Sequence, residues 1–190
     1  MRKILLVCTG NTCRSPMAEA MLKDLARKAG KEIEVRSAGI AARDGFPLSA
    51  GAEEVLRRRQ LEIPGPSRAL TGELVEWADL VLTMTVSHKR MIIGKYPDAA
   101  DKTHTLKEFS LQDDQAAKDL EEADRLLAEY QISLVTGQEW DKEKEERLKE
   151  LQSRLPDLDI ADPFGGSLEV YEQSAAEIEA ALKRALDKLG

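Results

Sequence analysis

Short apolar runs alternate with amphipathic stretches along most of this chain. The runs have the length and composition of strands buried in a parallel sheet, and they cover residues 3–7, 32–36, 80–84 and, more weakly, 102–106. Between and after them, apolar residues recur three and four positions apart, as on one side of a helix, over residues 16–30, 49–60, 71–78, a segment starting at 87, and 168–189.

Strands that alternate with helices predict an α/β fold, with a parallel sheet covered by helices on both sides. Thr71 and Ser87 stand where helix N-caps are expected, and Gly30 stands where the first long helix should close. Right-handed crossovers bring the carboxyl ends of parallel strands to one edge of the sheet. The loop after residues 3–7 is therefore expected at the edge where ligands bind.

Residues 112–155 interrupt this alternation with two charged helical runs and no strand between them. The apolar residues of the first run are Ala116, Leu120, Ala123, Leu127 and Leu134, and those of the second are Trp140, Leu148 and Leu151. The tripeptide Thr136-Gly137-Gln138 supplies a turn between the runs. We expect one domain over residues 1–190, interrupted by a helical hairpin inserted at about 112–155.

The net charge of −7 is concentrated in one part of the chain. Residues 111–160 hold 15 acidic and 7 basic residues, whereas the remainder holds 20 and 21. This distribution argues against nucleic acid as a partner. A solvated helical face is the simpler interpretation of the acidic segment, and a surface for a protein partner at 112–155 is the alternative.

Neither a membrane nor an export signal is indicated. No apolar run approaches the length of a bilayer span, and the apolar part of residues 1–8 is too short for a signal peptide. The two cysteines fall within the first 13 residues, so they do not form the framework of a secreted protein. With His88 and His104 they do not match zinc-ligand spacing. We expect a cytoplasmic protein without a metal or other cofactor.

The first loop holds the clearest chemical signal. Cys8 and Arg14 are separated by five residues, between a buried strand and a helix that begins near Ser15. Backbone N–H groups of such a loop can point at an anion, and the helix adds its positive end. Arg14 offers paired planar donors for phosphate oxygens. This setting favours the thiolate form of cysteine, which is the nucleophile.

Small and polar residues in the same loop fit that chemistry. Ser15 can donate a hydrogen bond to the thiolate, Gly10 allows close approach of the backbone, and Asn11 tolerates a left-handed conformation. The plain alternative is a structural cysteine in an ordinary strand-to-helix turn. The coincidence of glycine, asparagine and serine in this context argues against it.

The stretch Val7-Cys8-Thr9-Gly10-Asn11-Thr12-Cys13-Arg14-Ser15-Pro16 resembles the active-site loop of low-molecular-weight protein tyrosine phosphatases. Ser37-Ala38-Gly39 resembles the Ser-Ala-Gly that follows the second strand in that family, and Asp162-Pro163 resembles its general-acid loop. The resemblance covers residues 1–110 and 160–190, outside the hairpin. It implies a three-layer, doubly wound sheet of four parallel strands, no metal, and phosphorylated proteins as substrates.

The resemblance also implies roles for individual residues. Cys8 attacks phosphorus, Arg14 binds the phosphoryl oxygens, and Asp162 protonates the leaving atom before activating water. The residues implied to surround the phosphate or substrate are Thr9, Gly10, Asn11, Thr12, Cys13, Ser15 and Phe164. Asn11 and Ser37 are expected to hold the shape of the loop. Many family members have histidine at the position of Gly65, so part of this support is expected to differ.

The two cysteines suggest redox sensitivity. An accessible Cys8 thiolate oxidises to sulfenic acid, and Cys13 in the same loop can condense with it to a disulfide. We expect reversible inactivation by mild peroxide.

Two positions bear on the substrate. Tyrosine-specific members usually have an aliphatic residue in place of Thr12, and tyrosines after the Asp-Pro in place of Phe164-Gly165-Gly166. Both features resemble the bacterial protein arginine phosphatases of the family. A threonine hydroxyl suits a polar leaving group, and an aromatic ring can pack on a guanidinium. Neutral drift at Thr12, or a core or lid role for Phe164, would explain the residues more simply.

The sequence thus favours a protein arginine phosphatase over three alternatives. The first is a phosphotyrosine phosphatase of the same family. The second is an arsenate reductase, which needs further cysteines, and none follows Cys13. The third is a non-catalytic protein that binds phosphorylated side chains, which would have no use for Cys8 and Asp162 together.

Overall fold

The computed structural model describes residues 1–189, and it divides into two compact units. The first unit comprises Met1–Ser110 and the chain from Leu158 onward, and the second comprises Leu111–Asp157. The domain expected from the sequence ends at residue 190, which lies outside the described residues. The hairpin expected at about 112–155 corresponds to the second unit. We describe each unit separately.

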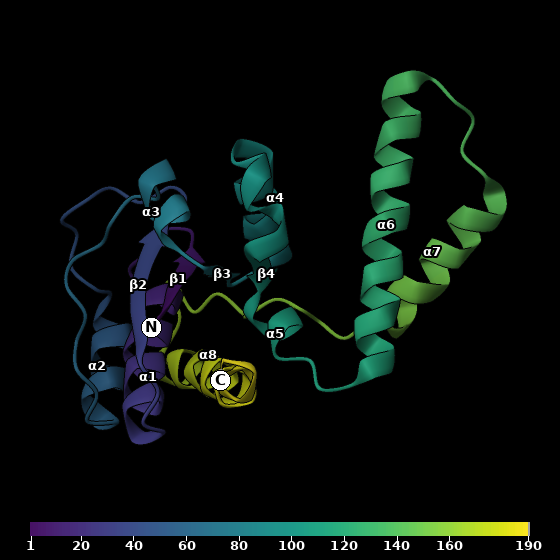
Figure 1. Cartoon of the computed structure of the whole chain (residues 1–190). Coiled ribbons are helices and arrows are strands. Elements are labelled where there is room, and N and C mark those ends of the chain that lie inside the picture. The colour runs from purple at the N-terminus through teal and green to yellow at the C-terminus, as the bar shows by residue number, and fades with distance from the viewer. Residues whose placement is uncertain (190) are drawn as a thin grey trace. The chain divides into compact units, whose positions relative to one another are not determined.

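The first unit is built on a sheet of four parallel strands in the order β2-β1-β3-β4 (Figure 1). The strands are β1 (Arg2–Cys8), β2 (Ile33–Gly39), β3 (Leu80–Thr83) and β4 (Thr103–Thr105). The central strand β1 pairs with both β2 and β3, with Cys8 opposite Gly39. The predicted α/β sheet is confirmed, and Cys8 is the last residue of its central strand.

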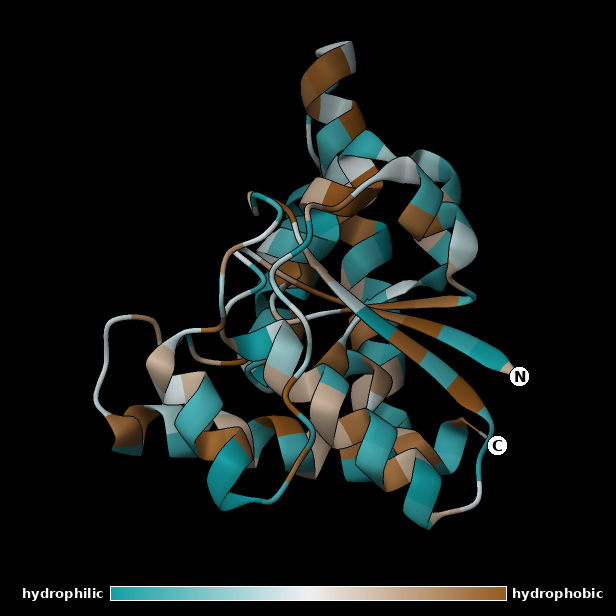
Figure 2. Ribbon diagram, turned by 90° about the vertical axis from the view of Figure 1, so that its left-hand side faces the viewer, coloured by the Kyte–Doolittle hydropathy of each residue, from teal (hydrophilic) through white to brown (hydrophobic). Residues whose placement is uncertain are grey.

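Helices cover both faces of this sheet. They are α1 (Arg14–Lys28), α2 (Ala50–Arg58), α3 (Gly72–Trp77), α4 (Val86–Lys95), η1 (Pro97–Lys102), α5 (Leu106–Phe109) and α8 (Leu168–Lys188). Residues of α1, α2, α5 and α8 form one apolar core, and residues of α3, α4 and η1 form another. In Figure 2 the helices are banded in teal and brown, because each buries apolar residues on one side.

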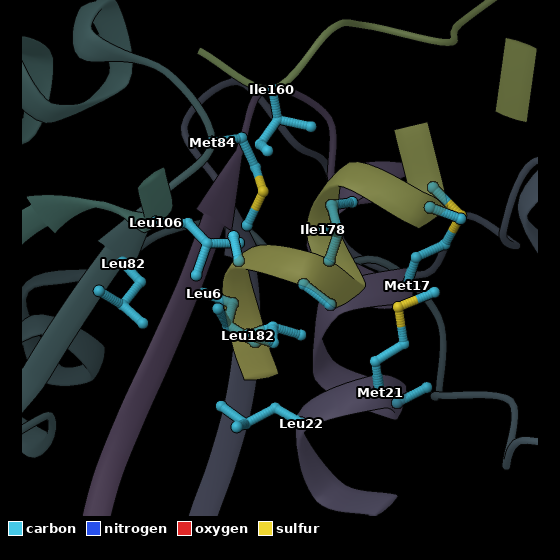
Figure 3. Packing of buried hydrophobic residues seen from close by; sticks show 14 of the residues in the cluster. Leu6, Met17, Met21, Leu22, Leu82, Met84, Leu106, Ile160, Ile178 and Leu182 are labelled. Carbon is cyan, nitrogen blue, oxygen red and sulfur yellow. The ribbon is translucent and has the colours of Figure 1, made fainter. Parts of the chain in front are cut away.

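Alternate residues of β1 enter the two cores, as the pleat of a strand requires. Leu6 belongs to the core with α1 and α8, and Leu5 belongs to the core with α3 and α4. Figure 3 shows Leu182 of α8 next to Leu6, and Ile160 next to Met84 at the end of the cluster. The amide nitrogen of Ile160 also donates to the carbonyl oxygen of Met84 over 2.8 Å. The segment that approaches Asp162 is therefore fixed to the carboxyl end of β3.

Several element boundaries differ from the sequence prediction. Strand β2 continues to Gly39, so Ser37-Ala38-Gly39 ends the strand rather than following it. The fourth strand has three residues, and the short helices η1 and α5 on either side of it were not predicted. Strand β4 stops because Thr105 forms a capping box with Glu108, which starts α5 at once.

One predicted helix cap is wrong. Helix α4 begins at Val86, and its N-cap is Thr85 rather than Ser87. Thr85 is extended, and its hydroxyl accepts a hydrogen bond from the backbone nitrogen of His88 over 3.1 Å, three residues on. The cap predicted at Thr71 is confirmed, and Gly30, with φ of 65°, follows the end of α1 as predicted.

The second unit is a helical hairpin of α6 (Asp114–Thr136) and α7 (Lys142–Arg154). Its apolar contacts are made by Ala123, Leu126, Leu148 and Leu151. Ion pairs join the two helices, including Glu122 with Arg147 at 2.7 Å. Gly137 ends α6 in a left-handed conformation with φ of 69°, as expected of the turn.

Not every apolar residue selected from the sequence belongs to the apolar cluster of the hairpin. Leu134 is 63% exposed, and Leu126, which the sequence analysis did not select, is buried instead. Because Lys144 near the start of α7 pairs with Glu129 at 2.6 Å, the last turns of α6 extend beyond α7. Trp140 precedes α7 and packs edge-on against Tyr130, with ring centroids 5.3 Å apart.

Within residues 1–189, none of the helices is long and apolar enough to cross a bilayer.

Glu108 connects α4, β4 and α5 in the first unit. Its carboxylate accepts hydrogen bonds from the Lys89 ammonium at 2.9 Å and from the backbone nitrogen of Thr105 at 3.0 Å. Burial alone would raise the pKa of Glu108, but its hydrogen bonds with His104 and Lys89 outweigh burial and lower the pKa to about 2. The ionised carboxylate therefore stabilises the fold above pH 4.5, and this contribution is lost as the pH falls toward 2.

We predict that Glu108→Gln lowers the free energy of unfolding at pH 7 by on the order of 2–3 kcal/mol. The difference from the wild type should shrink between pH 4.5 and pH 2, as Glu108 becomes protonated and therefore neutral like glutamine. Urea unfolding at several pH values measures it. Glu54→Gln, on the outer face of α2, is the control and should change the free energy of unfolding little. If the difference in the free energy of unfolding stays constant with pH, the ionised Glu108 carboxylate is not its source.

A second prediction concerns the hairpin. The Lys107 ammonium donates to the carbonyl oxygen of Asp159 over 2.6 Å, so the chain leaves and re-enters the first unit at nearby points. Replacing residues 112–155 by a short glycine-serine turn should leave a folded first unit. Circular dichroism should show fewer helical residues with one cooperative thermal transition. Loss of that transition would mean that the first unit needs the hairpin to fold.

Candidate active site

The loop from Cys8 to Arg14 lies between the end of β1 and the start of α1. Cys8 is 3% exposed, its Sγ lies 2.9 Å from Ser15 Oγ, and the backbone nitrogen of Asn11 donates to it over 3.3 Å. Helix α1 begins at Arg14 without a side-chain cap on its first N–H groups. The Ser15 hydroxyl, a backbone N–H and the N-terminus of α1 therefore surround the sulfur.

Asn11 holds this loop in shape from behind. Its φ is 53°, the left-handed conformation that the sequence analysis expected. Its side-chain nitrogen donates to Ser15 Oγ and to Ser37 Oγ, both over 2.9 Å, and its side-chain oxygen accepts from the backbone nitrogen of Arg68 over 2.8 Å. The amide thus links the loop to α1, to β2 and to the segment before α3.

Glu19 extends this network and was missed in the sequence analysis. The hydroxyl of Ser37 donates to one carboxylate oxygen of Glu19, and the Lys23 ammonium donates to the other, each over 2.5 Å. The available signal was its position four residues after Ser15, on the same side of α1. Gly65 lines a cavity of about 280 Å³ beside Glu19, and an added Cβ there would meet no atom within 4 Å. The space beside this network is therefore open.

Gly39 explains the motif at the end of β2. A Cβ on Gly39 would lie 2.6 Å from the carbonyl oxygen of Thr9 and 2.8 Å from the backbone nitrogen of Asn11. Only glycine allows the strand to approach the loop this closely. Just beyond it, the backbone nitrogen of Ile40 donates to the carbonyl oxygen of Cys8 over 3.0 Å, which fixes the loop from the side.

Arg14 and Asp162 meet across the loop, although they lie far apart in the sequence. Arg14 is 5% exposed. Its Nη1 donates to the carbonyl oxygen of Ile160 over 3.1 Å, and its Nη2 lies 3.0 Å from Asp162 Oδ2. Asp162 itself is half-exposed at 52%. A buried guanidinium thus orients an accessible carboxyl group.

A cavity of about 220 Å³ opens at this point. Its lining residues are Cys8, Thr9, Gly10, Thr12, Cys13, Arg14, Asp162 and Phe164. The backbone nitrogen of Phe164 donates to Asp162 Oδ1 over 3.2 Å, and its side chain is 74% exposed rather than in the core. Asn11 and Ser15, which were expected around the phosphate, are not among the lining residues. Both lie behind the loop, where Ser37, expected as a support, accepts a hydrogen bond from Asn11.

Cys13 has a different environment from Cys8. It is 5% exposed, and its Sγ lies 3.2 Å from Ser49 Oγ and 3.4 Å from the hydroxyl of Tyr171. Burial, together with the hydrogen bond to Cys13, raises the pKa of Tyr171 above its ordinary value. Both cysteines are free thiols, and the disulfide between them stays a prediction. Ser49 and Tyr171 were not selected from the sequence as neighbours of the loop.

His88 also contacts the loop, which the sequence analysis did not predict. It is 7% exposed, and its Nε2 lies 2.8 Å from Thr9 Oγ1. Burial, reinforced by the positive charge of Arg14, lowers the pKa of His88 to about 4. Its imidazole is therefore neutral at neutral pH.

The arrangement can carry out nucleophilic chemistry on a phosphoryl group. A sulfur at the floor, a guanidinium and the uncapped N-terminus of α1 suit an anion with several oxygens. A carboxyl group at the rim can donate and accept a proton. Among residues 1–189, no group of three or more histidine, cysteine, aspartate or glutamate side chains is placed to hold a metal ion.

Comparison with known proteins gives a consistent result. A family model described as low molecular weight phosphotyrosine protein phosphatase matches residues 3–129. The chain is 37% identical over 187 residues to a protein-arginine-phosphatase of Geobacillus stearothermophilus, across 98% of this chain and 95% of that protein. It is 35% identical over 186 residues to a protein-arginine-phosphatase of Bacillus subtilis, with coverage of 98% and 95%.

A solved structure leads to the same family. The low molecular weight protein tyrosine phosphatase from T. tengcongensis superimposes with a TM-score of 0.72 and 33% sequence identity, over 99% of each chain. This agreement covers the sheet, its helices and the loop that carries Cys8. The chain therefore belongs to the low-molecular-weight phosphotyrosine protein phosphatase family of cysteine-dependent enzymes.

Proposed function

We propose that this enzyme is a protein arginine phosphatase that hydrolyses phosphoarginine through a cysteinyl-phosphate intermediate. The observation that carries the proposal is the composition of the cavity, where Thr12 and the exposed ring of Phe164 lie with Asp162 around the nucleophile. The similarity to two protein-arginine-phosphatases over nearly the whole chain supports it.

In the first step, the Cys8 thiolate attacks phosphorus. A sulfur–phosphorus bond forms and the phosphorus–nitrogen bond of phosphoarginine breaks. Asp162 gives its proton to the departing nitrogen, so the product leaves as an arginine guanidinium. Arg14 and the backbone N–H groups of the loop bind the phosphoryl oxygens and the negative charge that develops on them.

In the second step, Asp162 acts in the opposite direction. Its carboxylate accepts a proton from water while that water attacks phosphorus, and the sulfur–phosphorus bond breaks to release phosphate. The departing Cys8 thiolate is stabilised by the hydroxyl of Ser15 and the backbone N–H of Asn11, at 2.9 and 3.3 Å. The same contacts therefore stabilise the nucleophile before the first step and the leaving group in the second.

Substrate choice is assigned to the rim of the cavity. A guanidinium is planar, polar and cationic, so it is suited by the Thr12 hydroxyl, by stacking on Phe164 and, once Asp162 has given up its proton, by the carboxylate of that residue. The glycines after Phe164 keep the turn small: the backbone nitrogen of Gly166 donates to the carbonyl oxygen of Pro163 over 2.9 Å. This leaves room beside the ring for a long side chain.

Phosphotyrosine is the second candidate substrate. The description of the matching family and the name of the T. tengcongensis relative favour it. An exposed Phe164 could equally stack on a phenyl ring. The two substrates make different demands on residue 12 of the enzyme. An apolar residue in place of Thr12 would give a phenyl ring an apolar wall, whereas a guanidinium would lose a polar partner.

The role of Asp162 predicts a dependence on the leaving group. Asp162→Asn keeps the size of the side chain but cannot donate a proton. Its rate should fall by about 10²–10⁴-fold on substrates with poor leaving groups and much less on a nitrophenyl phosphate. Steady-state kinetics on a series of aryl phosphates measures the trend. A loss of equal size on every member would argue against proton donation.

Thr12→Ile tests the substrate assignment. Wild-type enzyme should hydrolyse phosphoarginine-labelled protein faster than phosphotyrosine-labelled protein. Because the variant exchanges a hydroxyl for an ethyl group, it removes a polar partner and adds apolar bulk, so the ratio of the two kcat/KM values should shift toward phosphotyrosine by about ten- to a hundredfold. Assaying both substrates side by side measures the ratio.

Two controls accompany this comparison. Thr12→Ser keeps the hydroxyl and should keep the preference, and Cys8→Ser should be inactive on both substrates. If Thr12→Ile is folded and the ratio does not change, Thr12 does not select the substrate. If the wild type prefers phosphotyrosine, the arginine assignment is wrong, and the phosphatase assignment remains.

A further inference from the structure

His88 makes one hydrogen bond through its ring and lacks another. It lies in the first turn of α4, with Nε2 2.8 Å from Thr9 Oγ1. Its Nδ1 is buried and has no hydrogen-bond partner, and it is the one buried side-chain polar atom in that state among residues 1–189. Thr9 lines the cavity next to the nucleophile. A buried imidazole is therefore hydrogen-bonded to a hydroxyl group that lines the active site.

Two arrangements of hydrogens are compatible with this geometry, because neutral imidazole carries one N–H. With the hydrogen on Nδ1, a buried donor has no acceptor, and the Thr9 hydroxyl must donate to Nε2. With the hydrogen on Nε2, the imidazole donates to Thr9 Oγ1, and only an acceptor at Nδ1 lacks a partner. Buried donors without acceptors are the rarer defect in proteins. Neutral imidazole also intrinsically prefers its hydrogen on Nε2.

We propose that His88 is a positioning residue of this phosphatase: it donates its Nε2–H to Thr9 Oγ1 and thereby leaves the Thr9 hydroxyl hydrogen free to point into the cavity. There the hydroxyl donates to an oxygen of the phosphoryl group as negative charge develops. His88 does not touch the substrate and acts only through Thr9. The inference rests on the proposed phosphatase activity but not on the choice between arginine and tyrosine.

The surroundings of His88 suit this role. Burial and the positive charge of Arg14 lower the pKa of the ring and outweigh the negative charges of Asp159 and Asp162, which raise it, so the pKa of about 4 keeps the ring neutral. With its single N–H on Nε2, the neutral ring donates to Thr9 Oγ1 and leaves the threonine hydroxyl hydrogen for the cavity. The helix cap fixes the backbone that carries the ring, because the backbone nitrogen of His88 donates to Thr85 Oγ1. A donor fixed in advance stabilises transition-state charge without reorganisation.

A double-mutant cycle tests the coupling between the two residues. His88→Phe removes the donor but fills the space, and Thr9→Val removes the hydroxyl but keeps the shape. His88→Phe should lower kcat on a small aryl phosphate by roughly tenfold, with KM within about twofold. In the Thr9→Val background the same substitution should change kcat by less than about twofold. His88→Gln, which can place an N–H at a similar position, should restore most of the lost activity.

A spectroscopic measurement tests the hydrogen position directly. Nitrogen-15 spectra of the histidine rings in the wild-type protein distinguish a protonated from a bare Nδ1, and the His88 signal is assigned from its loss in His88→Gln. We expect hydrogen on Nε2 at pH 7. Hydrogen on Nδ1 would overturn the proposal, as would a full tenfold effect of His88→Phe in the Thr9→Val background. An inactive wild type would refute the phosphatase function, whereas the nitrogen signals would still decide the position of the hydrogen.

Discussion

The active site depends on the hydrogen bonds of one amide side chain, that of Asn11. Its left-handed backbone costs on the order of 1 kcal/mol, and asparagine bears that cost better than most residues. Three side-chain hydrogen bonds, to Ser15, Ser37 and the backbone of Arg68, contribute about 0.5–1.5 kcal/mol each and outweigh it. With the loop fixed in this way, the backbone nitrogen of Asn11 faces the sulfur of Cys8.

The remaining parts of the site reach the loop through the sheet and its covering helices. Asp162 arrives from a distant part of the chain, and it is held because the preceding Ile160 is buried, bonded to Met84 and contacted by Arg14. The guanidinium that is suited to a phosphoryl group thus also positions the carboxyl group. Arg14 therefore serves both to bind the phosphoryl group and to position Asp162, so a substitution of Arg14 would disturb both.

The sequence was informative where the chemistry is local. Cys8 to Ser15 is one continuous strand, loop and helix start, so the nucleophile, the left-handed residue and the neighbouring hydroxyl could be predicted from adjacent residues. Glu19, His88 and Tyr171 were missed because their partners, Ser37, Thr9 and Cys13, lie elsewhere in the chain. Of the three, Glu19 alone had a local signal, its position four residues after Ser15 on the same side of α1. Leu134 was misplaced because periodicity does not reveal that α7 is too short to cover the end of α6.

The bond from Lys107 to the carbonyl oxygen of Asp159 has a consequence for how this chain could evolve. It closes the base of the hairpin inside the first unit, so the ends of any segment inserted there are already held together. The entropic cost of a closed loop rises only by about 0.6 kcal/mol for each doubling of its length. A lineage can therefore lengthen, shorten or exchange this segment at small cost to folding, while Ile160 and Asp162 keep their places, which makes this junction a natural entry point for new sequence.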